Sequence, residues 1–125
     1  MNETMEKQTE KPRQVPLKLW KIAGKEDCFD QADLLIAADC SAFADPASYA
    51  ERVRGRVPLI CCPEADFDIA TRLSRVFSEN EIRSVTILCM ERPCCCELEE
   101  YVKEAVSLSG QTIPVQRIKM EAAAL

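Results

Sequence analysis

Short apolar segments alternate along the chain with segments whose apolar residues recur every three or four positions. Residues 17–22 and 114–120 alternate apolar and polar side chains, which predicts half-buried or edge strands. Residues 33–38, 57–61 and 84–90 are mostly apolar, which is typical of strands covered on both faces. The pattern therefore predicts about five strands.

Helical patterns separate the later strands. Asp45 followed by a proline predicts a capped helix that ends near Gly55. A second helix is predicted after a cap at Asp66 or Asp68, and a third ends at Gly110. The predicted buried faces carry Ile69, Leu73, Val76 and Phe77 in the second helix, and Leu98, Val102, Ala105 and Leu108 in the third.

Strands that alternate with helices predict right-handed crossovers and a parallel sheet with helices on both faces. The expected fold is α/β: a single three-layer α/β/α domain of the Rossmann or flavodoxin type, with a mainly parallel sheet of about five strands. Residues 15–120 are expected to form this domain. Residues 1–14 are expected to be a disordered polar tail, and residues 121–125 a short C-terminal tail.

Composition and charge exclude several classes of function. The 125 residues carry 16 Lys and Arg against 21 Asp and Glu, a net charge of −5, so nucleic acid is not an expected partner. No apolar run is long enough to cross a bilayer, which predicts no membrane insertion. Histidine is absent, which excludes His-based triads, His general bases and His metal ligands.

The unusual feature of the composition is its eight cysteines. The polar start of the chain has no apolar signal-peptide core, so a cytoplasmic, reducing location is expected. In that location, clustered cysteines are metal ligands or reactive thiols more often than disulfides.

Six of these cysteines follow or close predicted strands, and they are Cys40, Cys61, Cys62, Cys94, Cys95 and Cys96. Because the carboxyl ends of parallel strands share one edge of a sheet, we expect these residues to converge there. Cys28 and Cys89 are instead expected to be small buried packing residues.

Three kinds of chemistry fit such a cluster. Sulfur ligands alone favour an iron–sulfur cluster or a zinc site, although the C-x₂-C pairs typical of zinc are missing. A thiol-based redox enzyme or sulfur carrier is an alternative, because Cys94–Cys96 precede a predicted helix whose N-terminus would lower thiol pKa values. A structural zinc domain acting as an interaction module is the third.

Three segments in fixed order resemble one known family. They are residues 32–44, with Ala-Asp-Cys40; residues 60–66, with Cys62-Pro63; and residues 90–95, with Pro93-Cys94-Cys95. Over residues 15–119 the chain resembles the α/β domain that follows a ferredoxin-like segment in 4Fe-4S iron–sulfur binding proteins of anaerobic bacteria and archaea. The resemblance implies a 4Fe-4S cluster held by Cys40, Cys62, Cys94 and Cys95. It also implies electron transfer or an accessory role in an anaerobic redox system.

This sequence departs from the family pattern in two ways. Cys61 stands where the family has glycine, and Cys96 where it has a residue other than cysteine, so both are candidate extra ligands. The ferredoxin-like segment is missing upstream, so a separate ferredoxin-like or other redox protein is the expected partner. Zinc is the alternative cofactor.

Several other residues have simpler interpretations. Arg52, Arg54 and Arg56 form a basic patch that could dock an acidic partner, but the favoured interpretation is a solvated helix end. Asp39 is expected to form a turn, and Trp20 to pack in the core or at the sheet edge.

Overall fold

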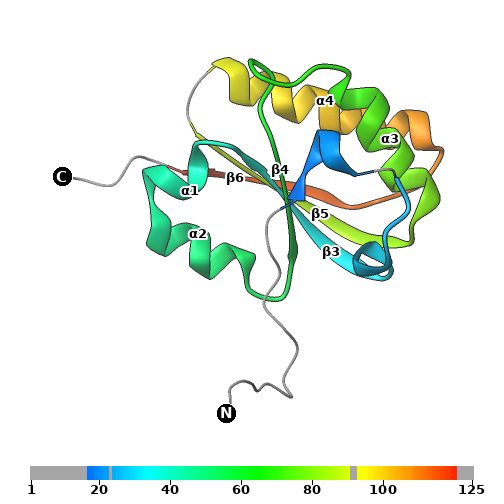
Figure 1. The fold of residues 1–125 in the computed structure, drawn as a ribbon, viewed down its shortest axis with the longest axis horizontal. Coiled ribbons are helices and arrows are strands. Elements are labelled where there is room, and N and C mark those ends of the chain that lie inside the picture. Colours follow the sequence, from blue (N-terminus) through cyan, green and yellow to red (C-terminus); the bar gives the residue numbers. More distant parts are fainter. Residues whose placement is uncertain (1–16, 23, 91–92, 121–125) are drawn as a thin grey trace, which may run out of the picture.

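Five parallel strands form one sheet in the computed structural model, which describes residues 17–22, 24–90 and 93–120, excepting the side chains of residues 93–96. The spatial order is β2 (Leu17–Lys18), β4 (Val57–Cys61), β3 (Ala32–Ala38), β5 (Ile82–Met90) and β6 (Val115–Met120) (Figure 1). Every strand pair is parallel, as predicted. The predicted tails, residues 1–14 and 121–125, lie outside the described residues.

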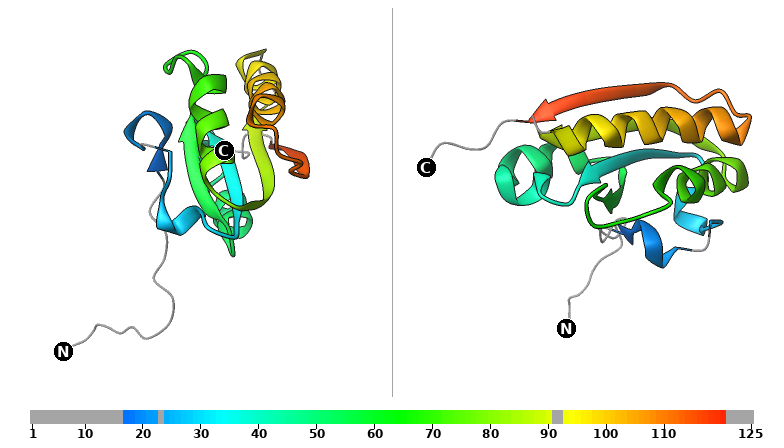
Figure 2. Two further views of the ribbon diagram at one scale, coloured as in Figure 1. Left: turned by 90° about the vertical axis from the view of Figure 1, so that its right-hand side faces the viewer. Right: turned by 90° about the horizontal axis from the view of Figure 1, so that it is seen from above.

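Helices cover both faces of this sheet. Figures 1 and 2 show α1 (Ser41–Ala44) and α2 (Pro46–Val53) on one face, and α3 (Ile69–Glu79) and α4 (Pro93–Ser109) on the other. Two 3₁₀ helices, η1 (Leu19–Lys21) and η2 (Asp27–Phe29), lie in the connection between β2 and β3. The predicted three-layer α/β/α fold is confirmed.

The central strand β3 supplies side chains to two cores. Leu34 and Ile36 enter the larger core under α3 and α4, whereas Leu35 and Ala37 enter the smaller core under α2. All four are fully buried, as expected for a strand covered on both faces. Alternation of side chains along the strand thus explains its continuous apolar run.

Helix ends follow the predicted signals at α2 but not at α3. The Asp45 carboxylate accepts a hydrogen bond from the Ser48 amide at 3.2 Å, and Gly55 takes the positive φ of 74° after the helix. Asp68 precedes α3 with φ 57°, but its side chain makes no capping hydrogen bond. The Asp66 carboxylate instead accepts from the Cys62 amide at 2.7 Å.

Three local predictions are wrong. The first predicted strand is only two residues long, because Leu19 turns into the core and is 1% exposed. Trp20, expected to pack in the core or at the sheet edge, is 53% exposed. Leu108, assigned to the buried face of the third helix, is 60% exposed, whereas Leu98 on the same helix is fully buried.

Candidate functional site

The carboxyl edge of the sheet contains the switch point of the fold. From β3 the chain crosses to β4 on one side, and from β4 it returns past β3 to β5 on the other. The connections that leave β3 and β5 therefore diverge to opposite faces of the sheet. This arrangement creates the crevice in which open α/β sheets bind their ligands.

Three strands reach this edge in register. Ala37 of β3 is paired with Ile60 of β4 and also with Leu88 of β5. Cys40 therefore comes three residues after Ala37, and Cys62 comes two residues after Ile60. The register brings two of the sequence-predicted ligands to the ends of adjacent strands.

Cys40 lies at the start of α1, immediately beyond β3. Its carbonyl oxygen accepts the amide hydrogen bonds of Phe43 at 3.2 Å and Ala44 at 3.0 Å. The neighbouring Ser41 hydroxyl is buried and donates to the Ala38 carbonyl at 2.7 Å, which closes the turn out of the strand. The Cys40 side chain itself is exposed.

Cys61 and Cys62 differ sharply in environment although they are adjacent. Cys61 ends β4 and is fully buried in the core under α3 and α4. This burial, together with nearby Asp66 and Asp39, raises the pKa of the Cys61 thiol well above its ordinary value. Cys62 is half-buried. Burial thus opposes the thiolate form that ligation by Cys61 would need.

The Cys62 backbone is held in a tight loop. Its amide donates to Asp66, and its carbonyl oxygen accepts from the amides of Ala65 at 3.0 Å and Asp66 at 2.7 Å. These reciprocal bonds fix the chain between β4 and α3. The local cause is the Asp side chain, which can hydrogen-bond backbone amides in turns.

Cys94, Cys95 and Cys96 belong to the first turn of α4, directly after Pro93 and the connection from β5. Their backbone thus lies inside the helix at the switch-point edge, whereas the sequence interpretation placed these cysteines just before the helix. Their side chains lie outside the described part of the chain. Convergence of their sulfur atoms with those of Cys40 and Cys62 stays a prediction. Within the described residues, no group of three or more potential metal ligands is found.

An ion pair that the sequence interpretation missed lies at the same edge. Lys18, the last residue of β2, places its Nζ 2.8 Å from Oδ2 of Asp39, the residue before Cys40. The hydrogen bond to Asp39 raises the pKa of the Lys18 amine, although partial burial lowers it. The other oxygen of Asp39, Oδ1, is buried without a hydrogen-bond partner among the described residues. Asp39 therefore does more than form a turn.

The remaining two cysteines pack as predicted. Cys89 is 2% exposed within the larger core, and Cys28 packs against that core from η2, before β3. Burial also raises the pKa of the Cys28 thiol, and the nearby Glu26 and Asp27 charges add to the increase. Cys28 lies before β3, away from the carboxyl edge, whereas Cys89 is the next-to-last residue of β5 and lies close to that edge with its side chain in the core.

The fold and its switch-point edge define a doubly wound α/β domain. A family model described as a Rossmann-like domain matches residues 27–124, and the chain belongs to this family. The match begins at η2 and includes β3 to β6, so it contains the whole candidate edge except Lys18. No curated protein and no solved structure matches the chain significantly. Within the described residues, no helix has the length and apolar character needed to cross a membrane.

Proposed function

We propose that this protein binds a 4Fe-4S iron–sulfur cluster through Cys40, Cys62, Cys94 and Cys95. Its role would be electron transfer, or that of an accessory subunit, in an anaerobic, cytoplasmic redox system. The observation that supports the proposal is the register of the sheet, which delivers Cys40 and Cys62 to one edge beside the first turn of α4.

The chemistry of these donors suits the proposal. Thiolates are the ligands that iron–sulfur clusters take, and the chain has no histidine to compete with them. Cys40 is exposed and Cys62 is half-buried, so both are more accessible to a metal than Cys61, which is fully buried. The bound cluster would supply one-electron chemistry at an exposed edge, where a separate ferredoxin-like protein would exchange electrons.

The surrounding residues have defined tasks in this proposal. The loop from Cys62 to Asp66 fixes the direction in which Cys62 leaves β4. Amides in the first turn of α4 can donate to cluster sulfurs, and the positive end of the helix dipole favours an anionic cluster. Lys18 adds a positive charge close to Cys40, partly neutralised by Asp39.

One observation favours a second candidate function. The three consecutive cysteines in the first turn of α4 occupy a position that lowers thiol pKa values. They would suit a thiol-based redox enzyme or a sulfur carrier, in which one thiolate attacks and a neighbour resolves the mixed disulfide. This candidate requires no metal.

Anaerobic purification followed by iron, zinc and acid-labile sulfide analysis tests the proposal, because air oxidises exposed thiols. We expect a brown protein that contains iron and sulfide in equal amounts. Cys62→Ala and Cys95→Ala should lose most of both. Cys28→Ala is the matched control and should keep both, since Cys28 precedes β3 and lies away from the carboxyl edge.

Three results would overturn the proposal. One is a colourless protein after anaerobic reconstitution with iron and sulfide. Another is stoichiometric zinc without sulfide, which would identify a structural zinc domain. The third is a metal-free protein in which Cys94, Cys95 or Cys96 is alkylated much faster than Cys28, which would identify the thiol-based function.

A further inference from the structure

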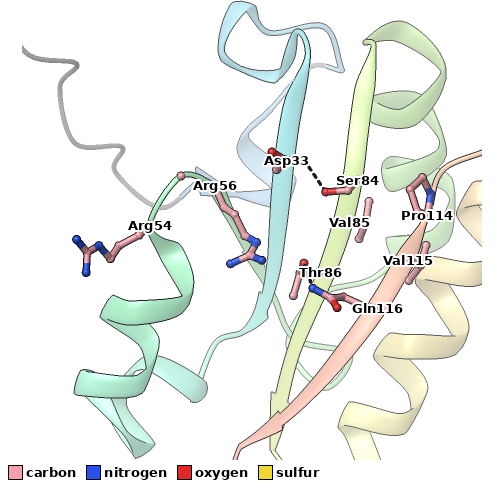
Figure 3. A pocket seen from close by; sticks show the side chains of 10 residues that line it. Asp33, Arg54, Arg56, Ser84, Val85, Thr86, Pro114, Val115 and Gln116 are labelled. Atoms are coloured by element: carbon pink, nitrogen blue, oxygen red, sulfur yellow. Dashed lines mark hydrogen bonds between the residues drawn. The ribbon is translucent and has the colours of Figure 1, made fainter.

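A groove of about 410 Å³ lies at the opposite, amino edge of the sheet, on the face that carries α2. Figure 3 shows it between the end of α2 and the first residues of β5 and β6. Its lining includes Asp33, Arg54, Arg56, Ser84, Thr86 and Gln116. Small-molecule sites have volumes of about 300–1,000 Å³, so the groove is large enough for a small ligand.

The topology explains why this groove is open. The crossover from β3 to β4 places α2 over one half of this sheet face. The crossovers from β4 to β5 and from β5 to β6 place α3 and α4 on the other face. No described helix therefore covers the amino halves of β5 and β6 on the α2 side.

Arg56 supplies the positive charge of the groove. Its side chain extends over the sheet, whereas that of Arg54 points away from it (Figure 3). One guanidinium nitrogen of Arg56 donates to the Arg52 carbonyl at 2.7 Å, at the end of α2. No carboxylate among the described residues pairs with Arg56, and a guanidinium carries five N–H donors, so most of them remain available.

Asp33 is the one acidic side chain in the described lining, and it already contacts other residues. Its Oδ1 accepts from the Ser84 hydroxyl at 2.7 Å, and its Oδ2 lies 3.7 Å from an Arg83 nitrogen. The lining holds two arginines against this one carboxylate, which Arg83 also approaches, so the groove has a net positive charge and favours an anion.

The floor of the groove offers neutral hydrogen-bonding groups beside apolar surface. The side-chain amide of Gln116 donates to the Thr86 hydroxyl at 3.1 Å. Thr86 is only 1% exposed, so the hydrogen-bonding group presented to a ligand here is the exposed Gln116 amide. Pro114 adds apolar surface, whereas Val85 and Val115 pack with the larger core on the other face of the sheet. A ligand with one anionic group and a polar, partly flat body would fit this groove. The anionic group would lie on Arg56 and the body on the floor.

We propose that this groove binds a small phosphomonoester of about nucleoside-monophosphate size, with its phosphate on Arg56 and its body over Thr86 and Gln116. The planar donors of arginine match phosphate oxygens in pairs, and the volume accommodates a ligand of this class. The site is independent of the cysteine edge and of the function proposed for it. A sugar phosphate and a mononucleotide share this chemistry, so the test includes both.

Isothermal titration calorimetry with AMP and with ribose 5-phosphate tests the proposal, and adenosine is the control without phosphate. We expect saturable binding of at least one phosphate compound and none of adenosine. Tighter binding of AMP than of ribose 5-phosphate would show that the base contacts the groove. Equal affinities for the two would identify a sugar phosphate as the ligand class. Arg56→Gln should weaken binding at least about tenfold, the loss expected for a charge-assisted hydrogen bond.

Two further variants distinguish a specific site from general attraction to positive charge. Arg52→Gln makes the same change of charge on exposed α2 outside the groove lining, and it should leave affinity nearly unchanged. Arg56→Lys keeps the charge but loses the paired donors, so its affinity should be intermediate.

The proposal fails if neither phosphate compound binds saturably to the wild-type protein. It also fails if adenosine binds as tightly as AMP, or if Arg52→Gln weakens binding as much as Arg56→Gln. Thermal unfolding of each variant checks folding, because Arg56 also binds the end of α2. If Arg56→Gln unfolds, the affinity of Arg56→Lys decides: an affinity equal to wild type overturns the proposal.

Discussion

Tyr49 on α2 carries a buried hydroxyl for which the described residues provide no hydrogen-bond partner. A buried polar group without a partner costs about 1–3 kcal/mol relative to a satisfied one. Tyr49→Phe removes that group and keeps the ring, which packs against the smaller core. We expect the free energy of unfolding, measured in urea at pH 7, to rise by about 1 kcal/mol. A loss of stability would show that the hydroxyl has a partner in solution.

The same substitution has a pH dependence with a definite sign. Burial raises the pKa of Tyr49 above its ordinary value of 10.0. The unfolded chain therefore releases the phenol proton first, and stability falls as the pH rises from that value towards the higher folded pKa. The stabilisation by Tyr49→Phe should thus be larger at alkaline pH than at pH 7. An equal difference at both pH values would contradict this.

Single residues also show what a sequence can and cannot reveal about the site. Cys61 and Cys62 look alike in the sequence, yet Cys61, the last residue of β4, is buried in the core, whereas Cys62, in the loop beyond the strand, is half-buried. The end of the strand at Cys61 can be predicted from the apolar run. The pairing of Lys18 with Asp39 cannot, because the two residues meet only through the strand order β2-β4-β3.

At the scale of elements, the two ends of α4 test how the helix packs. Leu98 is fully buried and Leu108 is 60% exposed, although both fit the apolar period of the sequence. We expect Leu98→Ala to lower the free energy of unfolding by about 2–5 kcal/mol, and Leu108→Ala by less than about 0.5 kcal/mol. Urea unfolding of the matched pair measures both. Similar losses would mean that Leu108 is covered in solution.

The elements that could be predicted best are those whose burial is uniform. β3 and β4 have continuous apolar runs, and both strands form where the pattern places them. β2 forms only two bridges, with Leu59 and Ile60, at the edge of the sheet. An edge strand has one neighbour, so a turn that buries Leu19 outweighs further pairing. The alternation of apolar and polar residues does not tell which of the two, burial of Leu19 or further strand pairing, is more stable.

At the scale of the whole molecule, topology determines which parts of the chain come together. The carboxyl-edge cysteines could be placed from βα alternation alone, since parallel strands share that edge. The amino-edge groove could not, because it depends on the crossovers that place both α3 and α4 on one face. The basic residues after α2 therefore look like an ordinary solvated helix end until the strand order is known.

The separation of the two edges makes the two proposals independently testable. From Ser84, beside the groove, to Met90, beside the cysteine edge, β5 rises by roughly 20 Å at about 3.3 Å per residue. Sites farther apart than about 10 Å that share no partners act additively. Cys62→Ala should therefore leave AMP affinity unchanged, and Arg56→Gln should leave iron and sulfide content unchanged. In the double variant, calorimetry and metal analysis should show only the two separate losses. A loss of AMP binding in folded Cys62→Ala would instead mean that the sheet couples its two edges.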